Sequence, residues 1–71
     1  MKINNIREYV AECTECHYYY VEHHMSYDNV AREVLLSPMT VKRRLESLKD
    51  FNIDMYSEYV AERRKRRNGK K

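Results

Sequence analysis

The chain contains only one proline, Pro38, and one glycine, Gly69, among its 71 residues. β-Strands must be joined by frequent turns, and turns draw heavily on these two residue types, so the sequence argues against an all-β fold. Hydrophobic residues make up 42% of the chain, which is more than a wholly disordered chain normally contains. The sequence therefore predicts a small all-α domain of about four helices.

Several classes of protein are disfavoured. No apolar run approaches the roughly 20 residues of a membrane span, and residues 1–10 lack the apolar core of a secretory signal. Two cysteines without such a signal are expected to stay reduced, so we expect a cytoplasmic protein without membrane contact. The carboxylates Glu8, Glu12 and Glu15 fall on one solvated helix face, and so small a core is hard to hollow into an active site. We therefore expect no enzymatic activity.

Periodicity and capping residues divide the chain into four helices. The expected segments are residues 5–25, residues 27–35 after a cap at Ser26, residues 38–49 after a cap at Ser37, and a helix capped by Asp54 and ended by Asn68-Gly69. Phe51 and Ile53 are expected as apolar anchors in the loop before the last helix. The positions expected on the apolar faces of these helices are Ile3, Ile6, Val10, Cys13, His17, Tyr20, His24, Val30, Ala31, Val34, Val41, Leu45, Leu48, Tyr56, Tyr59 and Val60.

The second and third helices have the spacing of a helix-turn-helix over residues 27–49. Ala31 is small enough to let the two helices cross closely, and Val41 and Leu45 would pack beneath the first of them. Leu35 occupies the turn position that usually holds glycine, because the backbone there tends toward positive φ. A leucine in that conformation would cost about 1 kcal/mol.

In this motif the third helix enters the major groove of DNA with its N-terminal part. Its exposed side chains are expected to contact base edges, with Lys42 and Arg43 donating to guanine and Met39 touching a thymine methyl. The predicted base contacts are Pro38, Met39, Lys42 and Arg43. The predicted backbone contacts of the motif are Arg32, Ser37, Thr40 and Arg44.

Positive charge is concentrated at the C-terminus. Residues 60–71 contain seven basic residues and one acid, Glu62, whereas the first helix is predominantly acidic. This asymmetry favours a surface directed at a polyanion, although a basic tail that only aids solubility is the plain alternative. We divide the chain into a helical DNA-binding domain, residues 1–63, and a basic C-terminal tail, residues 64–71.

Residues 18–67 resemble the stage III sporulation protein D family of helix-turn-helix transcriptional regulators. The shared features are a Y-x-x-E opening, Val30-Ala31, Ser37 followed by Thr40-Val41, Asn52-Ile53-Asp54, and a last helix that ends in basic residues. The resemblance implies sequence-specific DNA binding with activation or repression of transcription, and base contacts from Met39, Lys42 and Arg43. It implies backbone or second-groove contacts from Arg63, Arg64, Arg66 and Arg67. Lys65 belongs to the same basic run and is also predicted to contact the backbone.

The expected function is therefore that of a DNA-binding transcriptional regulator. Double-stranded DNA is the expected partner, RNA polymerase is a candidate second partner, and the expected state is a monomer or weak dimer. Two other functions stay open. One is a protein-interaction module that uses the first helix, and the other is an architectural DNA binder without sequence preference.

Cys13 and Cys16 form a C-x-x-C pattern near His17, His23 and His24. Zinc sites usually take a second ligand pair from a separate element, and no cysteine or histidine follows His24. We interpret Cys13 as a core residue, and His17 and His24 as residues at the margin of an amphipathic face. No metal or cofactor is expected.

Overall fold

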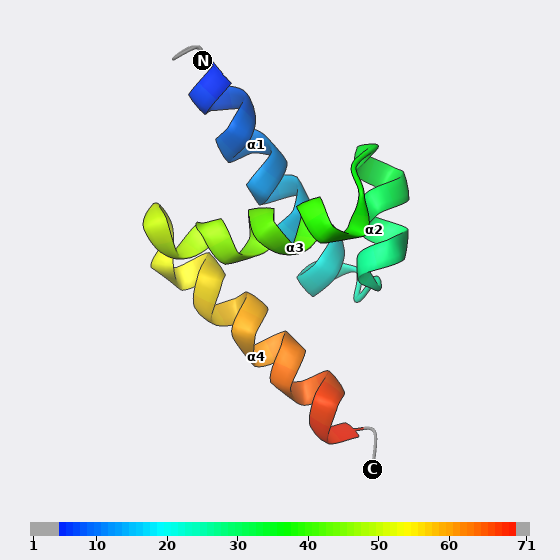
Figure 1. Cartoon of the computed structure of the whole chain (residues 1–71). Coiled ribbons are helices and arrows are strands. Elements are labelled where there is room, and N and C mark those ends of the chain that lie inside the picture. Colours follow the sequence, from blue (N-terminus) through cyan, green and yellow to red (C-terminus); the bar gives the residue numbers. More distant parts are fainter. Residues whose placement is uncertain (1–4, 70–71) are drawn as a thin grey trace.

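The computed structural model describes residues 5–69, and all of its regular elements are helical (Figure 1). This confirms the predicted all-α class. The elements in chain order are α1 (Asn5–His17), a π-helical turn η1 (Tyr18–Glu22), α2 (Tyr27–Val34), α3 (Pro38–Glu46), a 3-10 turn η2 (Ser47–Asp50) and α4 (Ile53–Gly69). No helix within residues 5–69 combines the length and apolar character that a membrane crossing needs.

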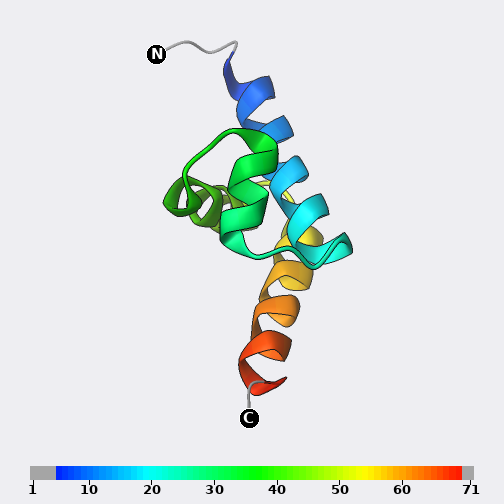
Figure 2. The ribbon, with the colours of Figure 1, turned by 90° about the vertical axis from the view of Figure 1, so that its right-hand side faces the viewer.

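Helix α3 lies across the middle of the molecule, between α1 and α4 (Figure 1). Helix α2 packs beside it, and the start of α1 and the end of α4 lie at opposite ends of a molecule that measures 44 × 25 × 17 Å. The C-terminal half of α4 extends beyond the other helices in both views (Figure 2). The predicted tail is therefore part of α4 as far as Gly69, and residues 70 and 71 lie outside the described residues.

Two predicted helix starts are confirmed. The Ser26 hydroxyl accepts a hydrogen bond from the Asn29 N–H, and the Ser37 hydroxyl accepts one from the Thr40 N–H, each at 3.2 Å. Each serine thereby satisfies one of the amide donors that a helix start leaves without a partner. Pro38 occupies the first turn of α3, as predicted.

The predicted cap of α4 is wrong. Asn52, not Asp54, accepts the hydrogen bond of a first-turn amide, from the Met55 N–H at 3.1 Å. Asparagine caps as well as aspartate, so the helix begins two residues earlier than the sequence suggested. Asp54 lies inside the first turn, where its charge still suits the positive end of the helix.

The first helix is shorter than the predicted 5–25. After His17 the backbone widens into the π-helical turn, with the His23 N–H bonded to the Tyr18 carbonyl at 3.3 Å. The chain then reverses at His24, which has a φ of 55°. The helix therefore ends before Met25.

The third helix is also shorter than predicted, because its last turn tightens into η2. This turn places Leu48 in the core and directs the following residues outward. The predicted loop anchors are wrong, since Phe51 is 40% exposed and Ile53, in the first turn of α4, is 60% exposed. Ile6 is also exposed, and Ile3 lies outside the described residues.

The core joins all four helices. Its buried residues are Cys13, Cys16, Tyr20, Val30, Ala31, Val41, Leu45, Leu48 and Tyr59. At one end, Tyr20 stacks on Tyr27 with ring centroids 5.0 Å apart and meets Tyr59 edge-on at 5.3 Å. These tyrosines connect η1, α2 and α4, and aromatic packing therefore contributes to holding α4 against the body.

The turn between α2 and α3 has the geometry expected of the motif. Leu35 adopts a left-handed conformation, with φ 59° and ψ 44°, and its side chain is 88% exposed. The Leu36 N–H donates to the Ala31 carbonyl at 3.0 Å, which closes the end of α2 as a Schellman motif. Leucine therefore holds a backbone conformation that glycine adopts without steric cost.

We predict that Leu35→Gly raises the free energy of unfolding by about 1 kcal/mol, because it removes the left-handed strain and loses no buried contact. Urea denaturation followed by circular dichroism measures the change. Leu35→Ala is the matched control, since it keeps the Cβ atom and should bring no such gain. Equal stability of the two variants would show that the backbone at Leu35 is not strained.

Candidate nucleic-acid interface

Helix α3 presents all four of its predicted base-contacting residues to solvent. Val41 and Leu45 on the inner face of α3 are fully buried, so the opposite face of the helix points outward. On that face Met39 is 65% exposed, and Pro38, Lys42 and Arg43 are exposed as well. Within residues 5–69, neither Lys42 nor Arg43 forms an ion pair, so both charges remain available to a ligand.

Arg44 lies elsewhere. Its Nε donates to Glu12 Oε1 at 2.9 Å, and its guanidinium lies 4.4 Å from the centroid of the Tyr9 ring. Both partners belong to α1, so Arg44 connects α3 to α1 instead of extending toward a ligand. The sequence predicted that Arg44 contacts the DNA backbone, but in the structure its side chain points toward α1.

The other predicted backbone contacts of the motif surround the start of α3. Ser37 donates to the Thr40 hydroxyl at 2.9 Å while capping the helix. Arg32 is exposed in the last turn of α2. These three side chains come from the turn and its two flanking helices, and none of them is buried.

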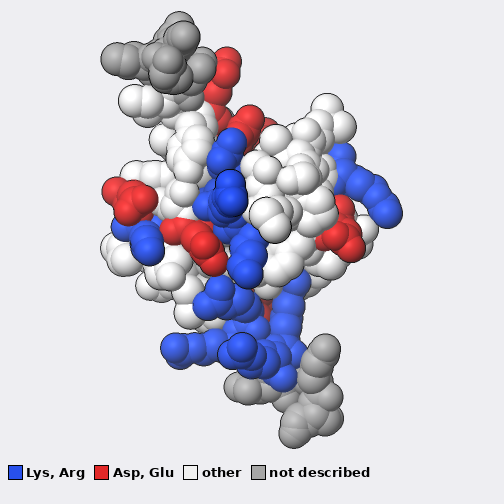
Figure 3. Space-filling view, viewed as in Figure 1, with Lys and Arg blue, Asp and Glu red and all other residues white. Residues whose placement is uncertain are grey.

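A basic surface covers α3 and α4. Its exposed residues are Lys42, Arg43, Arg63, Arg64, Lys65 and Arg67. Lys and Arg side chains gather on one face in a band that runs from α3 to the C-terminal half of α4, with acidic side chains mainly to its sides (Figure 3). The two basic regions of the sequence are thereby brought onto one face.

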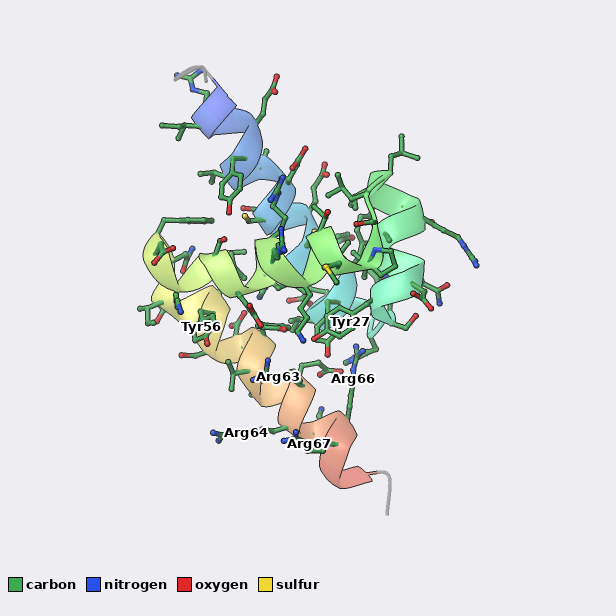
Figure 4. The ribbon with its side chains drawn as sticks, in the orientation of Figure 1. Tyr27, Tyr56, Arg63, Arg64, Arg66 and Arg67 are labelled. Carbon is green, nitrogen blue, oxygen red and sulfur yellow. The ribbon has the colours of Figure 1, made fainter. Side chains whose placement is uncertain are left out.

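Arg66 differs from its neighbours because it is directed inward (Figure 4). Its Nε donates to Glu62 Oε2 at 2.9 Å and its Nη2 donates to the Tyr20 carbonyl at 2.8 Å. The guanidinium also lies 3.8 Å from the centroid of the Tyr20 ring. Arg66 therefore fastens α4 to η1, a role that reading the basic run as a tail did not reveal.

Glu62 is the acidic side chain that this arrangement buries, at 7% exposure. It also hydrogen-bonds His24 Nδ1 at 3.1 Å, so Glu62, His24 and Arg66 form what we call the Glu62 cluster. Burial would raise the pKa of Glu62, but the hydrogen bonds from His24 and Arg66 outweigh it and hold the pKa below its usual 4.5.

Arg63 belongs to a chain of aromatic hydroxyls. Its Nη1 donates to the Tyr59 hydroxyl at 3.4 Å, and that hydroxyl is hydrogen-bonded to the hydroxyl of Tyr27 at 2.8 Å. Burial and the bond to Tyr59 raise the pKa of Tyr27 to about 12, so its phenol stays neutral. Arg63 retains most of its N–H donors for a further partner.

Sequence reasoning missed a groove between the start of α2 and α4. It has a volume of about 310 Å³ and is lined by Tyr20, Ser26, Tyr27, Arg63, Arg66 and Arg67. We call it the α2–α4 groove. The spacing of Arg63 and Arg67 places both on one helix face, but nothing local in the sequence indicates that this face meets the start of α2.

The C-x-x-C pattern lies inside the core. Burial raises the pKa of Cys13 to about 11 and that of Cys16 to about 12, so both thiols stay protonated. His17 is buried and hydrogen-bonds Glu58 on α4 at 2.7 Å. Within residues 5–69, no group of three or more His, Cys, Asp or Glu side chains is arranged to hold a metal ion.

Comparison of the chain with protein-family models, with curated proteins and with solved structures gave no match. The resemblance to the sporulation regulators therefore rests on the residues quoted for it.

We predict that Arg66→Ala lowers the free energy of unfolding by about 2 kcal/mol, because it removes two charge-assisted hydrogen bonds and one of the two hydrogen-bonding partners of a buried carboxylate. Arg67→Ala removes the same charge from an exposed position and should change stability by less than about 0.5 kcal/mol. Urea denaturation compares the two variants. Equal losses would show that Arg66 acts only through its charge.

The Glu62 cluster predicts an acid-sensitive fold. Because the pKa of Glu62 is lower in the folded state, its ionised form stabilises the fold above pH 4.5, and this contribution is lost as the pH falls through the lower, folded value. We expect the melting temperature of Glu62→Gln to depend less on pH between about 5 and 3 than that of the unaltered chain. If the melting temperatures of the two proteins fall in parallel as the pH is lowered, the acid sensitivity belongs to other groups.

Proposed function

We propose that this protein is a sequence-specific, double-stranded DNA-binding regulator of transcription. The observation that carries the proposal is the basic surface, which joins the exposed face of α3 to α4 on one side of the molecule (Figure 3). A helix-turn-helix whose second helix is exposed and basic matches the shape and charge of a major groove. The quoted resemblance supports the same function.

In this proposal α3 lies in the major groove. Lys42 and Arg43 donate to guanine O6 and N7, and Met39 provides an apolar contact of the kind that a thymine methyl accepts. Pro38 is the first residue of α3 and lies at the end of the helix that is closest to the bases. Ser37, Thr40 and Arg32 contact the adjacent phosphates and set the register of the protein on the duplex.

Helix α4 supplies the second contact region. Arg63, Arg64, Lys65 and Arg67 face solvent and contact the backbone next to the groove that α3 occupies. Arg44 and Arg66 have intramolecular partners, so we assign them to the protein scaffold instead of the DNA contact.

A protein-interaction module that uses the first helix is less well supported. The face that such a module would offer contains Cys13, Cys16, His17 and Tyr20, and all four are buried inside the domain. An architectural DNA binder shares the basic surface, and it differs from a regulator only in lacking sequence preference.

Selection of random duplex DNA by the pure protein at two salt concentrations tests the proposal. A sequence-specific regulator enriches one motif that persists at the higher salt concentration. An architectural binder enriches none, and its binding falls steeply as salt rises, because phosphate contacts release counterions. Absence of duplex binding at low salt would refute both.

Substitutions separate base reading from phosphate contact. We expect Arg43→Ala to weaken binding to the selected duplex by about tenfold and to random duplex by much less, because a bidentate base contact contributes about 1–3 kcal/mol of discrimination. Arg64→Ala should weaken both duplexes by the same factor. Competition binding at one fixed salt concentration measures the ratios. Identical ratios for the two variants would contradict this assignment.

A further inference from the structure

The α2–α4 groove combines features that suit an anion. Three arginines from α4 and the first residues of α2 line it, and none of the described residues that line it is acidic. Arg66 is neutralised by Glu62, whereas Arg63 and Arg67 have no acidic partner within residues 5–69. The groove therefore carries two uncompensated positive charges.

The donors around this groove come from both of the helices that border it. Tyr27 and Arg66 approach each other from α2 and α4, with Arg63 beside them, while Arg64 is directed away (Figure 4). The first amides of α2 have no acceptor inside the helix, and Ser26 accepts only from that of Asn29. Amide donors and guanidinium groups together are the usual ligands of a phosphate.

Arg63 is held ready for such a ligand. Its hydrogen bond to Tyr59 uses one of its five N–H donors, and the Tyr59–Tyr27 bond fixes that hydroxyl in turn. Asp28 also lies in the first turn of α2, but it is exposed and does not line the groove. Its charge weakens the site without occupying it.

We propose that the α2–α4 groove binds a phosphate group through Arg63, Arg67 and the start of α2. The phosphate comes from the DNA backbone, an assignment that rests on the proposed function, or from a free phosphate compound. A backbone phosphate held there bridges the helix-turn-helix and α4, so that both contact the duplex in a single register.

Inorganic phosphate tests the site without DNA. In a titration at constant ionic strength, followed by NMR, we expect saturable shifts of the Ser26 and Tyr27 amides and of the Arg63 and Arg67 side-chain N–H groups. Arg67→Gln should abolish this saturation, whereas Arg64→Gln, which removes the same charge from a position of α4 outside the groove, should preserve it. Equal behaviour of the two variants, or shifts that chloride reproduces, would overturn the site.

A duplex with single neutral methylphosphonate linkages identifies the source of the phosphate. At one position in the duplex, we expect the neutral linkage to weaken binding by the unaltered protein about tenfold, because it removes a charge-assisted hydrogen bond. Arg67→Gln already lacks that bond, so the same linkage should weaken its binding by less than about twofold. Arg64→Gln should keep the full effect at that position.

The outcomes separate the two proposals. If the protein binds duplex and binds inorganic phosphate saturably, but no methylphosphonate position shows this effect, the groove belongs to a free phosphate compound. If the protein binds duplex but shows neither the methylphosphonate effect nor saturable phosphate binding, the groove is refuted and the proposed function stands. Saturable phosphate binding by a protein that binds no duplex supports the groove and refutes the proposed function.

Discussion

The placement of α4 depends on how one buried carboxylate is satisfied. Glu62 is 7% exposed, and an ion at that depth is tolerated only when its oxygens accept strong hydrogen bonds. His24 and Arg66 provide these bonds, and Arg66 also donates to the Tyr20 carbonyl. Because His24 follows η1 and Arg66 belongs to α4, satisfying the charge forces the two segments together.

This constraint divides the basic residues into two groups. Arg44 and Arg66 have acidic and aromatic partners inside the domain, whereas Arg43, Arg64 and Arg67 face solvent without acidic partners among the described residues. Net charge alone treats these arginines as equivalent. The fold makes them different, because only the second group keeps its hydration and its donors for a polyanion.

Local signals in the sequence predicted the helix-turn-helix correctly. The caps at Ser26 and Ser37 and the left-handed Leu35 depend on neighbours within five residues, so a one-dimensional pattern contains them. The role of Arg66 was not predictable in that way, because its partner Tyr20 is 46 residues distant in the chain. The π-helical turn was missed for a related reason, since core packing of Tyr20 overrides the ordinary helical repeat.

Two histidine–glutamate pairs help to set which face of α4 meets solvent. His17 bonds Glu58 and His24 bonds Glu62, one helical turn apart on α4. A single attachment would leave a helix free to rotate about its own axis, whereas two on one face fix its rotation as well as its tilt. With that face held against α1 and η1, the outward arginines of α4 take fixed directions beside α3. The histidines that the sequence suggested as edge residues therefore act together with buried Tyr59 and with Arg66 to align the two basic helices into one surface.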